Sequence, residues 1–167
     1  MPEKQVAVVM GSDSDLPVVE ETIKLLTGMG VAAEVRVLSA HRTPDEVHAF
    51  ATGAREKGIK VIIAAAGGAA HLAGVIASLT TLPVIGLPME TASFKGMDSL
   101  LSTVQMPSGV PVATVAVGKA GAVNAAVLAL QILALADDGL RKKLEDYKAA
   151  LAKKVKAKDA DVRGQSE

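Results

Sequence analysis

The alternation of strand-like and helix-like segments constrains the fold of this chain most. Five short runs dominated by apolar residues occur along it, and a segment with helical spacing or composition follows each run. Continuous apolar runs, such as those at residues 6–10 and 61–66, are typical of parallel strands that are buried on both faces. The other runs span residues 33–38, 83–87 and 112–117. Regular alternation of strand and helix predicts a parallel sheet with helices on both faces and right-handed crossovers.

Five strand–helix units joined by short loops favour an open sheet over a closed barrel, which needs eight units. We therefore expect an α/β fold, namely a flavodoxin-like three-layer α/β/α sandwich with a five-stranded parallel sheet. A chain of 167 residues corresponds to one domain with a sizeable core. We expect this domain over residues 1–153, including a charged C-terminal helix, and a charged, frayed tail over residues 154–167.

Composition excludes several classes of protein. The formal net charge is +0, so the chain lacks the basic surface of a nucleic-acid binder. It contains no Cys, which excludes disulfides, thiolate metal sites and thiol nucleophiles. The first residues lead into a strand pattern without the features of a signal peptide, so we expect a cytoplasmic protein that does not engage a membrane.

The segment at residues 120–136 predicts an oligomer. Its only polar side chains are Asn124 and Gln131, and it is short for a membrane span. A helix that is apolar nearly all round has to be buried on several sides. In a small chain, burial between subunits accomplishes this most simply, so we expect the helix near an interface between copies. Burial within its own domain stays open as the alternative.

The loops that hold the polar residues lie at one edge of the predicted sheet. In an open parallel sheet the ligand binds outside the carboxyl ends of the strands. The loops expected there are polar or rich in glycine, and they span residues 11–15, 39–44, 67–72, 87–96 and 118–121. The gathering of these loops at one edge is more than the fold itself requires, which favours a binding or catalytic site.

The loop at residues 39–44 carries the best candidate for chemistry. A strand pattern ends before it and a capping box begins a helix within it, with Thr43 as N-cap, Pro44 at the first helical position and Glu46 at the third. The sharp turn therefore falls at His41 and Arg42. His41 can titrate near neutral pH and is the best candidate for an acid/base group. Arg42 is a permanent cation that can bind a phosphate with two hydrogen bonds.

The loop at residues 11–15 adds backbone amides and hydroxyls at a helix N-terminus, which outlines an anion site. Asp15 would repel a phosphate, but it can accept hydrogen bonds from ribose hydroxyls. Plain helix capping by Ser12 or Asp13 is the alternative interpretation. Together with Arg42, this loop favours a phosphorylated sugar or a nucleotide monophosphate as ligand.

Several other patterns are rejected. His48 lies within a helix and is interpreted as structural or solvated, whereas His71 follows a glycine pair and either lines the pocket or satisfies backbone groups. No spacing indicates a metal site. Gly118–Lys119 lacks the remaining residues of a P-loop, and no G-x-G-x-x-G follows the first strand. A phospho-receiver needs an acceptor Asp after the third strand, where this chain has Ala and Gly.

Six blocks of sequence resemble the N5-carboxyaminoimidazole ribonucleotide mutase family of de novo purine synthesis. The blocks follow one another in register between residues 6 and 135. They are Gly11-Ser12-Asp13-Ser14-Asp15, Ser39-Ala40-His41-Arg42-Thr43-Pro44, Gly67-Gly68-Ala69-Ala70-His71-Leu72, Asp98-Ser99-Leu100-Leu101-Ser102, Gln105-Met106-Pro107 and Gly118-Lys119-Ala120-Gly121. So many blocks in order are far more specific than any one motif.

The resemblance implies a homo-octamer with active sites at subunit contacts. It implies an isomerase that needs no metal or organic cofactor and converts N5-carboxyaminoimidazole ribonucleotide to 4-carboxy-5-aminoimidazole ribonucleotide. It also admits a transient contact with the synthase that makes this substrate. Carried over by position, His41 is the acid/base, and the residues that bind or surround the ribonucleotide are Ser12, Asp15, Ser39, Arg42, Gly68, Ala69, His71 and Leu72.

Two alternatives stay open. The same residues suit a carboxylase that joins aminoimidazole ribonucleotide directly to carbon dioxide. A non-catalytic nucleotide-binding module on the same fold is the second, although binding alone needs no titrating group beside Arg42. The compact chain and the block at residues 105–107 look more like the mutase type.

Overall fold

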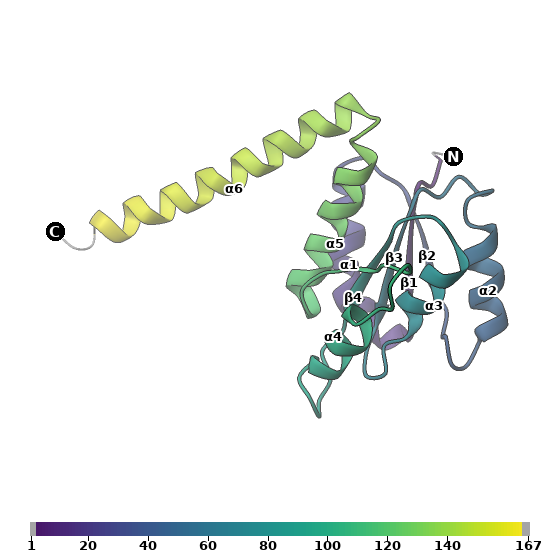
Figure 1. Cartoon of the computed structure of the whole chain (residues 1–167). Coiled ribbons are helices and arrows are strands. Elements are labelled where there is room, and N and C mark those ends of the chain that lie inside the picture. Colours follow the sequence, from purple (N-terminus) through teal and green to yellow (C-terminus); the bar gives the residue numbers. More distant parts are fainter. Residues whose placement is uncertain (1–2, 165–167) are drawn as a thin grey trace. The chain divides into compact units, whose positions relative to one another are not determined.

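The computed structural model describes residues 3–164 of the chain. A five-stranded parallel sheet forms the centre of the α/β part, with the strand order β2-β1-β3-β4-β5 (Figure 1). This is the flavodoxin-like order, so the predicted fold class is confirmed. The strands are β1 (Val6–Met10), β2 (Ala33–Val37), β3 (Val61–Ala66), β4 (Val84–Pro88) and β5 (Ala113–Thr114).

The central strands are buried and end at the same level. Every residue of β1, β3 and β4 is buried, as the continuous apolar runs predict. Met10 at the end of β1 pairs with Val37 on one side and Ala65 on the other. Ala66 at the end of β3 pairs with Pro88 at the end of β4. The segments that follow these four strands therefore meet at one edge of the sheet.

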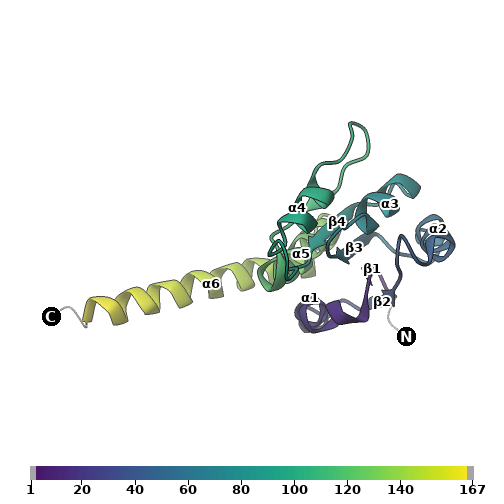
Figure 2. The ribbon, with the colours of Figure 1, turned by 90° about the horizontal axis from the view of Figure 1, so that it is seen from below.

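Helices cover both faces of the sheet. α1 (Leu16–Gly28) follows a 3-10 turn, η1 (Asp13–Asp15), and Thr22 of α1 donates a 2.7 Å hydrogen bond to the Ala122 carbonyl of α5 (Gly118–Leu133). On the other face α2 (Pro44–Gly53) and α3 (Leu72–Leu79) contribute Phe50 and Ile76 to a core that includes Ile62 of β3. Figure 2 shows α1 and α3 on opposite sides of the sheet. α4 (Met97–Val104) lies against β4.

The fifth strand and the helix after it differ from their predicted extents. The strand was expected over residues 112–117, but only Ala113 and Thr114 pair with β4, at Ile85 and Gly86. β5 is an edge strand with a single neighbour, and it forms only these two residue pairs before the chain enters α5. This helix was expected to be buried on several sides, mainly between subunits. Within the single chain it buries one side, made of Ala122, Ala125, Ala126, Ala129, Leu130 and Leu133, and leaves Asn124 exposed. Burial of its other side between subunits stays a prediction. No helix within residues 3–164 combines the length and apolar character that a membrane span requires.

The chain divides into two compact units between Ala129 and Leu130, within α5. The second unit contains the end of α5 and α6 (Asp138–Gly164), a continuous helix of 27 residues. Residues 154–164, predicted as part of a frayed tail, continue this helix because Lys and Ala favour it and no Pro interrupts it. Lys142 pairs with Asp146 at 3.1 Å, and the hydrogen bond to this carboxylate raises the pKa of Lys142. Residues 165–167 of the predicted tail lie outside the described part.

Candidate active site

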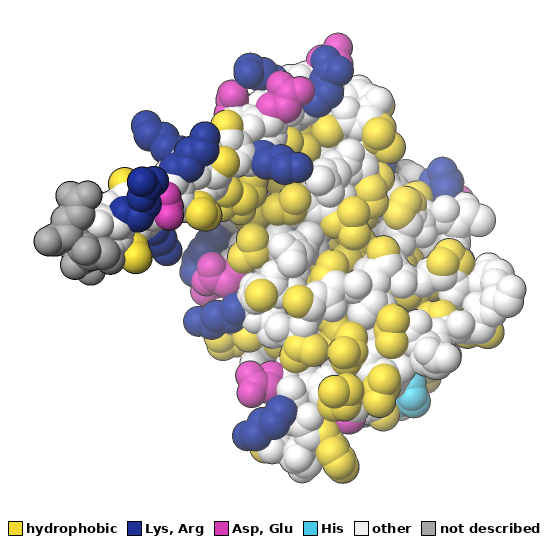
Figure 3. All heavy atoms as spheres, turned by 60° about the vertical axis from the view of Figure 1, so that its left-hand side comes forward, with side chains coloured by type: hydrophobic (Ala, Val, Ile, Leu, Met, Phe, Trp, Pro, Cys, Tyr) yellow, Lys and Arg dark blue, Asp and Glu magenta, His cyan; other side chains and the backbone are white. Residues whose placement is uncertain are grey.

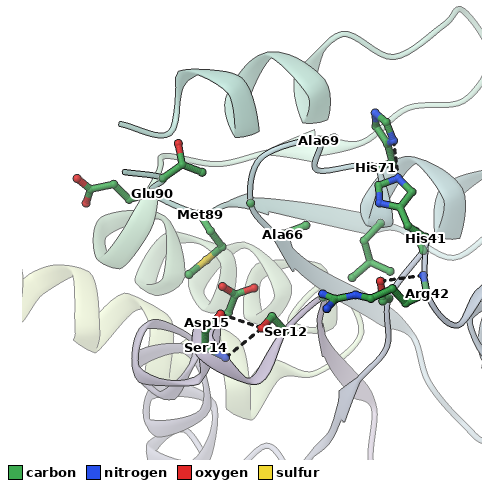
Figure 4. A pocket seen from close by; sticks show the side chains of 16 residues that line it. Ser12, Ser14, Asp15, His41, Arg42, Ala66, Ala69, His71, Met89 and Glu90 are labelled. Atoms are coloured by element: carbon green, nitrogen blue, oxygen red, sulfur yellow. Dashed lines mark hydrogen bonds between the residues drawn. The ribbon is translucent and has the colours of Figure 1, made fainter. Parts of the chain in front are cut away.

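A pocket of about 310 Å³ lies at the carboxyl edge of the sheet. The segments after β1, β2, β3 and β4 form it, as the in-register strand ends require. Figure 4 shows the His41 and His71 rings together on one side, with Ser12, Ser14 and Asp15 on another. The lining residues are Gly11, Ser12, Ser14, Asp15, Ser39, Ala40, His41, Arg42, Ala66, Gly67, Ala69, His71, Leu72, Met89, Glu90 and Thr91.

The turn that carries His41 and Arg42 is closed by its two ends. The Thr43 amide donates to the Ser39 carbonyl at 2.9 Å, and the Thr43 hydroxyl accepts from the Ser39 amide at 2.9 Å. The Arg42 amide donates to the Ser39 hydroxyl at 3.2 Å. The predicted capping box is therefore wrong in one respect, because Thr43 makes no side-chain bond into α2. Its hydroxyl turns back to Ser39, which shapes the turn at His41.

His41 and His71 form a pair across the pocket wall. The Nε2 atom of His41 lies 2.8 Å from Nδ1 of His71, and the rings meet edge to face with centroids 4.9 Å apart. A hydrogen bond between two ring nitrogens needs one donor and one acceptor, so the pair holds a proton between them. His71 thereby orients the His41 ring, and Nδ1 of His41 is the nitrogen outside this contact.

The segment after β1 places hydroxyls and a carboxyl at the start of α1. The Ser12 hydroxyl accepts from the Ser14 amide at 3.3 Å and from the Ser14 hydroxyl at 2.8 Å, so Ser12 caps the 3-10 turn η1. Capping by Ser12 was the alternative interpretation of this loop, although the cap is on η1 and not on α1. Asp15 is half-buried. Burial raises the pKa of its carboxyl and the neighbouring Asp13 adds to this, whereas a hydrogen bond with the Ser12 backbone opposes the shift.

The turn after β3, at residues 67–70, is held from behind by α4. The Gly68 amide donates to the Ser99 hydroxyl at 2.9 Å, and the Ala70 amide donates to the Ser102 hydroxyl at 3.0 Å. Gly68 has a φ of 68°, a left-handed conformation that favours glycine. The turn delivers His71 to His41 and leaves small side chains along the pocket wall.

The structure gathers most of the predicted site residues. His41, Ser12, Asp15, Ser39, Arg42, Ala69, His71 and Leu72 all line the pocket, whereas Gly68 does not. The pairing of His71 with His41 places it at the pocket, one of the two interpretations left open for it. His48 is exposed on α2 and lies outside the pocket lining.

Met89, Glu90 and Thr91 line the pocket but were not predicted. The position of their loop at the carboxyl edge was expected, yet no motif singled out these residues. Their place depends on where β4 ends in the sheet, which is a tertiary property. In Figure 4 Met89 and Glu90 lie on the side of the pocket away from the histidine pair.

The arrangement suits an anionic ligand and a proton transfer. Arg42 supplies a fixed positive charge, and the start of α1 supplies hydroxyls and the positive end of a helix dipole. The histidine pair supplies a group that can donate and accept protons. Within residues 3–164 no group of three or more His, Cys, Asp or Glu side chains comes together as a metal site would require.

Fold and pocket together define a flavodoxin-like α/β protein with a pocket at the carboxyl edge of its sheet, where two histidines, an arginine and several hydroxyls come together. The model of one protein family, AIR carboxylase, matches residues 5–154 of the chain. The chain belongs to the AIR carboxylase family.

Relatives of the chain share one name. A protein from Pyrococcus horikoshii is 54% identical over 153 residues, which cover 92% of this chain and 85% of that protein. A protein from Bacillus subtilis is 56% identical over 141 residues, covering 84% of this chain and 87% of that protein. Both are named N5-carboxyaminoimidazole ribonucleotide mutase. The resemblance seen in the sequence blocks is therefore confirmed.

A solved structure has the same fold. The crystal structure of Treponema denticola PurE matches with a TM-score of 0.85 and 29% sequence identity. The match covers 93% of this chain and 96% of that chain.

Proposed function

We propose that this protein is an N5-carboxyaminoimidazole ribonucleotide mutase of purine biosynthesis. The reaction moves a carboxylate from the exocyclic nitrogen of the substrate to a ring carbon and gives 4-carboxy-5-aminoimidazole ribonucleotide. One observation carries the proposal beyond the names of relatives. The pocket brings a titratable histidine, a fixed cation and a set of hydroxyls to one edge of the sheet.

His41 is the acid/base group in this account. As a donor, it protonates the exocyclic nitrogen, whose bond to the carboxylate carbon then breaks and releases carbon dioxide. The electron-rich ring carbon attacks the carbon dioxide, and a carbon–carbon bond forms. His41, now neutral, removes the proton from that ring carbon, and aromaticity returns. One side chain thus gives a proton and later takes one back, which an imidazole ring can do. The sequence is redox-neutral and employs no cofactor.

Confinement of carbon dioxide is the second requirement of the reaction. Recapture by the ring carbon requires that carbon dioxide stay beside it and that water stay out. Ala66 and Ala69 line the pocket, and Gly67 between them adds no side chain. This small apolar wall suits a neutral, linear molecule.

The remaining residues bind the ribonucleotide. Arg42 contacts the phosphate together with Ser12 at the start of α1, where backbone amides and the helix dipole favour an anion. Asp15 accepts hydrogen bonds from the ribose hydroxyls. Ser39, His71 and the 67–72 segment enclose the reacting ring. These contacts fix the ring against His41, so that binding energy remote from the reacting atoms supports the chemical step.

The catalytic domain is proposed to span residues 1–153, which the family match over residues 5–154 supports. We also propose a cytoplasmic homo-oligomer, an octamer with active sites at subunit contacts, and a transient contact with the upstream synthase. Exposed apolar side chains support self-association: Phe94, Met97, Leu101 and Val104 are all exposed in the α4 region. Figure 3 shows hydrophobic side chains gathered in the middle of one face, with charged side chains toward its margins. Such surface is costly to leave in water.

Two other functions are alternatives for the same pocket. A carboxylase that uses carbon dioxide directly would need the same groups, and the family description itself names AIR carboxylase. The shared name of the close relatives favours the mutase. A non-catalytic nucleotide-binding module would need no histidine pair at the pocket wall.

Replacement of His41 tests the proposal. The wild-type protein is expected to turn over N5-carboxyaminoimidazole ribonucleotide, and His41→Asn is expected to lose about 100-fold or more of kcat, as removal of a general acid/base does. Product binding, measured by calorimetry, is expected to stay close to the wild-type value. His48→Asn is the matched control because His48 is exposed and outside the pocket. Near wild-type turnover by His41→Asn would contradict the assigned role.

A further inference from the structure

We propose that Ser99 and Ser102 of α4 are positioning residues for this reaction. They hold the 67–70 turn so that its remaining backbone amides face the carboxyl group in transit. The inference rests on the proposed mutase function and deepens it. Neither serine lines the pocket, so any effect on catalysis has to act through the turn.

Two serine hydroxyls of α4 accept hydrogen bonds from backbone amides at alternate residues of the turn. The Ser99 hydroxyl is fully buried and accepts from the Gly68 amide at 2.9 Å. The Ser102 hydroxyl accepts from the Ala70 amide at 3.0 Å and donates to the Asp98 carbonyl of its own helix at 2.7 Å, with the Gly68 carbonyl 3.0 Å away. Serines inside a helix usually bond to their own helix, as Ser102 does here. Both serine oxygens also accept an amide of the neighbouring turn, which ties that turn to α4.

The other two amides of the turn are left for a ligand. Within the described residues, neither the Gly67 amide nor the Ala69 amide has a hydrogen-bond acceptor. Both residues line the pocket. The two amides flank Gly68, whose φ of 68° is left-handed, and backbone amides around such a residue are a common way to bind anionic oxygen. The carboxylate of substrate or product, and the oxygens of carbon dioxide between them, match this chemistry.

Gly67 lies close to side chains of the neighbouring pocket segment and of α4. A Cβ atom at this position would lie 3.4 Å from Cβ of Met89, 3.7 Å from Cγ2 of Thr91 and 3.8 Å from the Ser99 hydroxyl. The Thr91 hydroxyl donates to the Asp98 carboxylate at 2.8 Å, which ties the neighbouring pocket segment to the same helix. α4 thus holds two segments of the pocket wall from one side. A shift of the turn by a fraction of an ångström would move the amides and His71 together.

The test separates positioning from general stability. Ser102→Ala and Ser99→Ala are compared with Thr22→Val, which removes a buried hydroxyl bound to a backbone carbonyl far from the turn. Substrate loss, product and decarboxylated aminoimidazole ribonucleotide are measured in the same reaction, together with the melting temperature. Ser102→Ala is expected to lower kcat about 10-fold or more with KM changed less than about 3-fold, because misplacement affects the reacting groups most.

The decisive measurement is the share of consumed substrate that appears as decarboxylated aminoimidazole ribonucleotide. A loosened turn releases carbon dioxide, so this share is expected to rise in Ser102→Ala, to rise less in Ser99→Ala, and to stay at the wild-type value in Thr22→Val. Ser102→Thr keeps the hydroxyl and is expected to restore most of kcat. The positioning role is overturned if both alanine variants form the same share of decarboxylated product as the wild type. It is also overturned if that share changes in them only as much as it does in Thr22→Val. A wild-type protein that makes no product would instead overturn the proposed function.

Discussion

His41 and Arg42 are neighbours in sequence, yet their side chains have different surroundings. The His41 ring is held by His71, with Nε2 of His41 2.8 Å from Nδ1 of His71. Arg42 has no such constraint from the described residues beyond its amide bond to Ser39. In the proposed function the first is an oriented acid/base group and the second a cation that can adjust to a phosphate.

Arg42→Ala is predicted to weaken binding of the phosphorylated ligand. A charge-assisted hydrogen bond contributes about 1.5–3 kcal/mol, so the dissociation constant should rise about 10- to 100-fold, with a smaller change in kcat. Arg55→Ala is the matched control, because Arg55 donates to Thr81 at 2.9 Å just before β4 and lies outside the pocket. Titration calorimetry with the product checks both variants. An unchanged dissociation constant in Arg42→Ala would count against a phosphate contact.

Asp15 is predicted to oppose stability while it supports binding. Burial raises its pKa above the ordinary 3.8, so the folded state holds the proton more tightly than the unfolded state. Stability of the unliganded protein should therefore fall as pH rises from about 3.8 through the raised pKa, and then level off. Asp15→Asn should lack this decline and be at least as stable as wild type at pH 7.

The carboxyl group of Asp15 is a much stronger hydrogen-bond acceptor when it is ionised. Ligand affinity of the wild type should therefore fall as pH drops through the raised pKa, and Asp15→Asn should bind about 10-fold more weakly at pH 7. Urea unfolding and ligand titration across this pH range check the two effects. Wild-type stability that rises over the same interval would contradict the assignment.

At the scale of elements, the turn between β2 and α2 is fixed by Thr43. Thr43→Val removes the hydroxyl that accepts from the Ser39 amide, and keeps the β-branched shape. Thr43 does not cap α2, so the melting temperature should change little. Displacement of His41 should lower kcat/KM about 10-fold, because a small misplacement of reacting groups is costly. Thr43→Ser should retain activity, and a Thr43→Val enzyme as active as wild type would refute the role of the turn.

Packing between β4 and α4 is predicted to tolerate no side chain at Gly86. A Cβ there would lie 2.8 Å from Cγ1 of Val112 and closer still to Cγ2 of Thr103. Gly86→Ala should therefore cost about 1–3 kcal/mol of unfolding free energy. Gly53→Ala, where nothing lies within 4 Å, should instead add about 0.4–1 kcal/mol. Denaturant unfolding compares the two, and equal stabilities would contradict the packing argument.

Elements with strong local signals were predictable from sequence. Buried runs gave the positions of β1 and β3, and Pro44 marked the first residue of α2. β5 was overestimated because its apolar residues continue past the two that pair. The direction of the Thr43 hydroxyl depends on the distance back to Ser39, which a capping pattern does not encode.

At the scale of the whole molecule, site residues could be predicted from the sequence only where they belong to a recognisable local motif. Ser12, His41 and Arg42 belong to such motifs and lie together in the pocket. The place of Glu90 in the pocket wall depends on the order of strands in the sheet. The same is true of the hydrogen bond that the 67–70 turn donates to Ser99, so sequence spacing reveals neither.

The most direct test of the central claim is a paired turnover assay on the purified protein. One sample receives freshly made N5-carboxyaminoimidazole ribonucleotide, and the other receives aminoimidazole ribonucleotide with carbon dioxide at modest concentration. A mutase should form product rapidly from the first alone, well above the spontaneous decay of that substrate. Efficient product from the second, with the first consumed no faster than it decays, would make the protein a carboxylase. Binding of the ribonucleotide without product from either sample would leave a binding module.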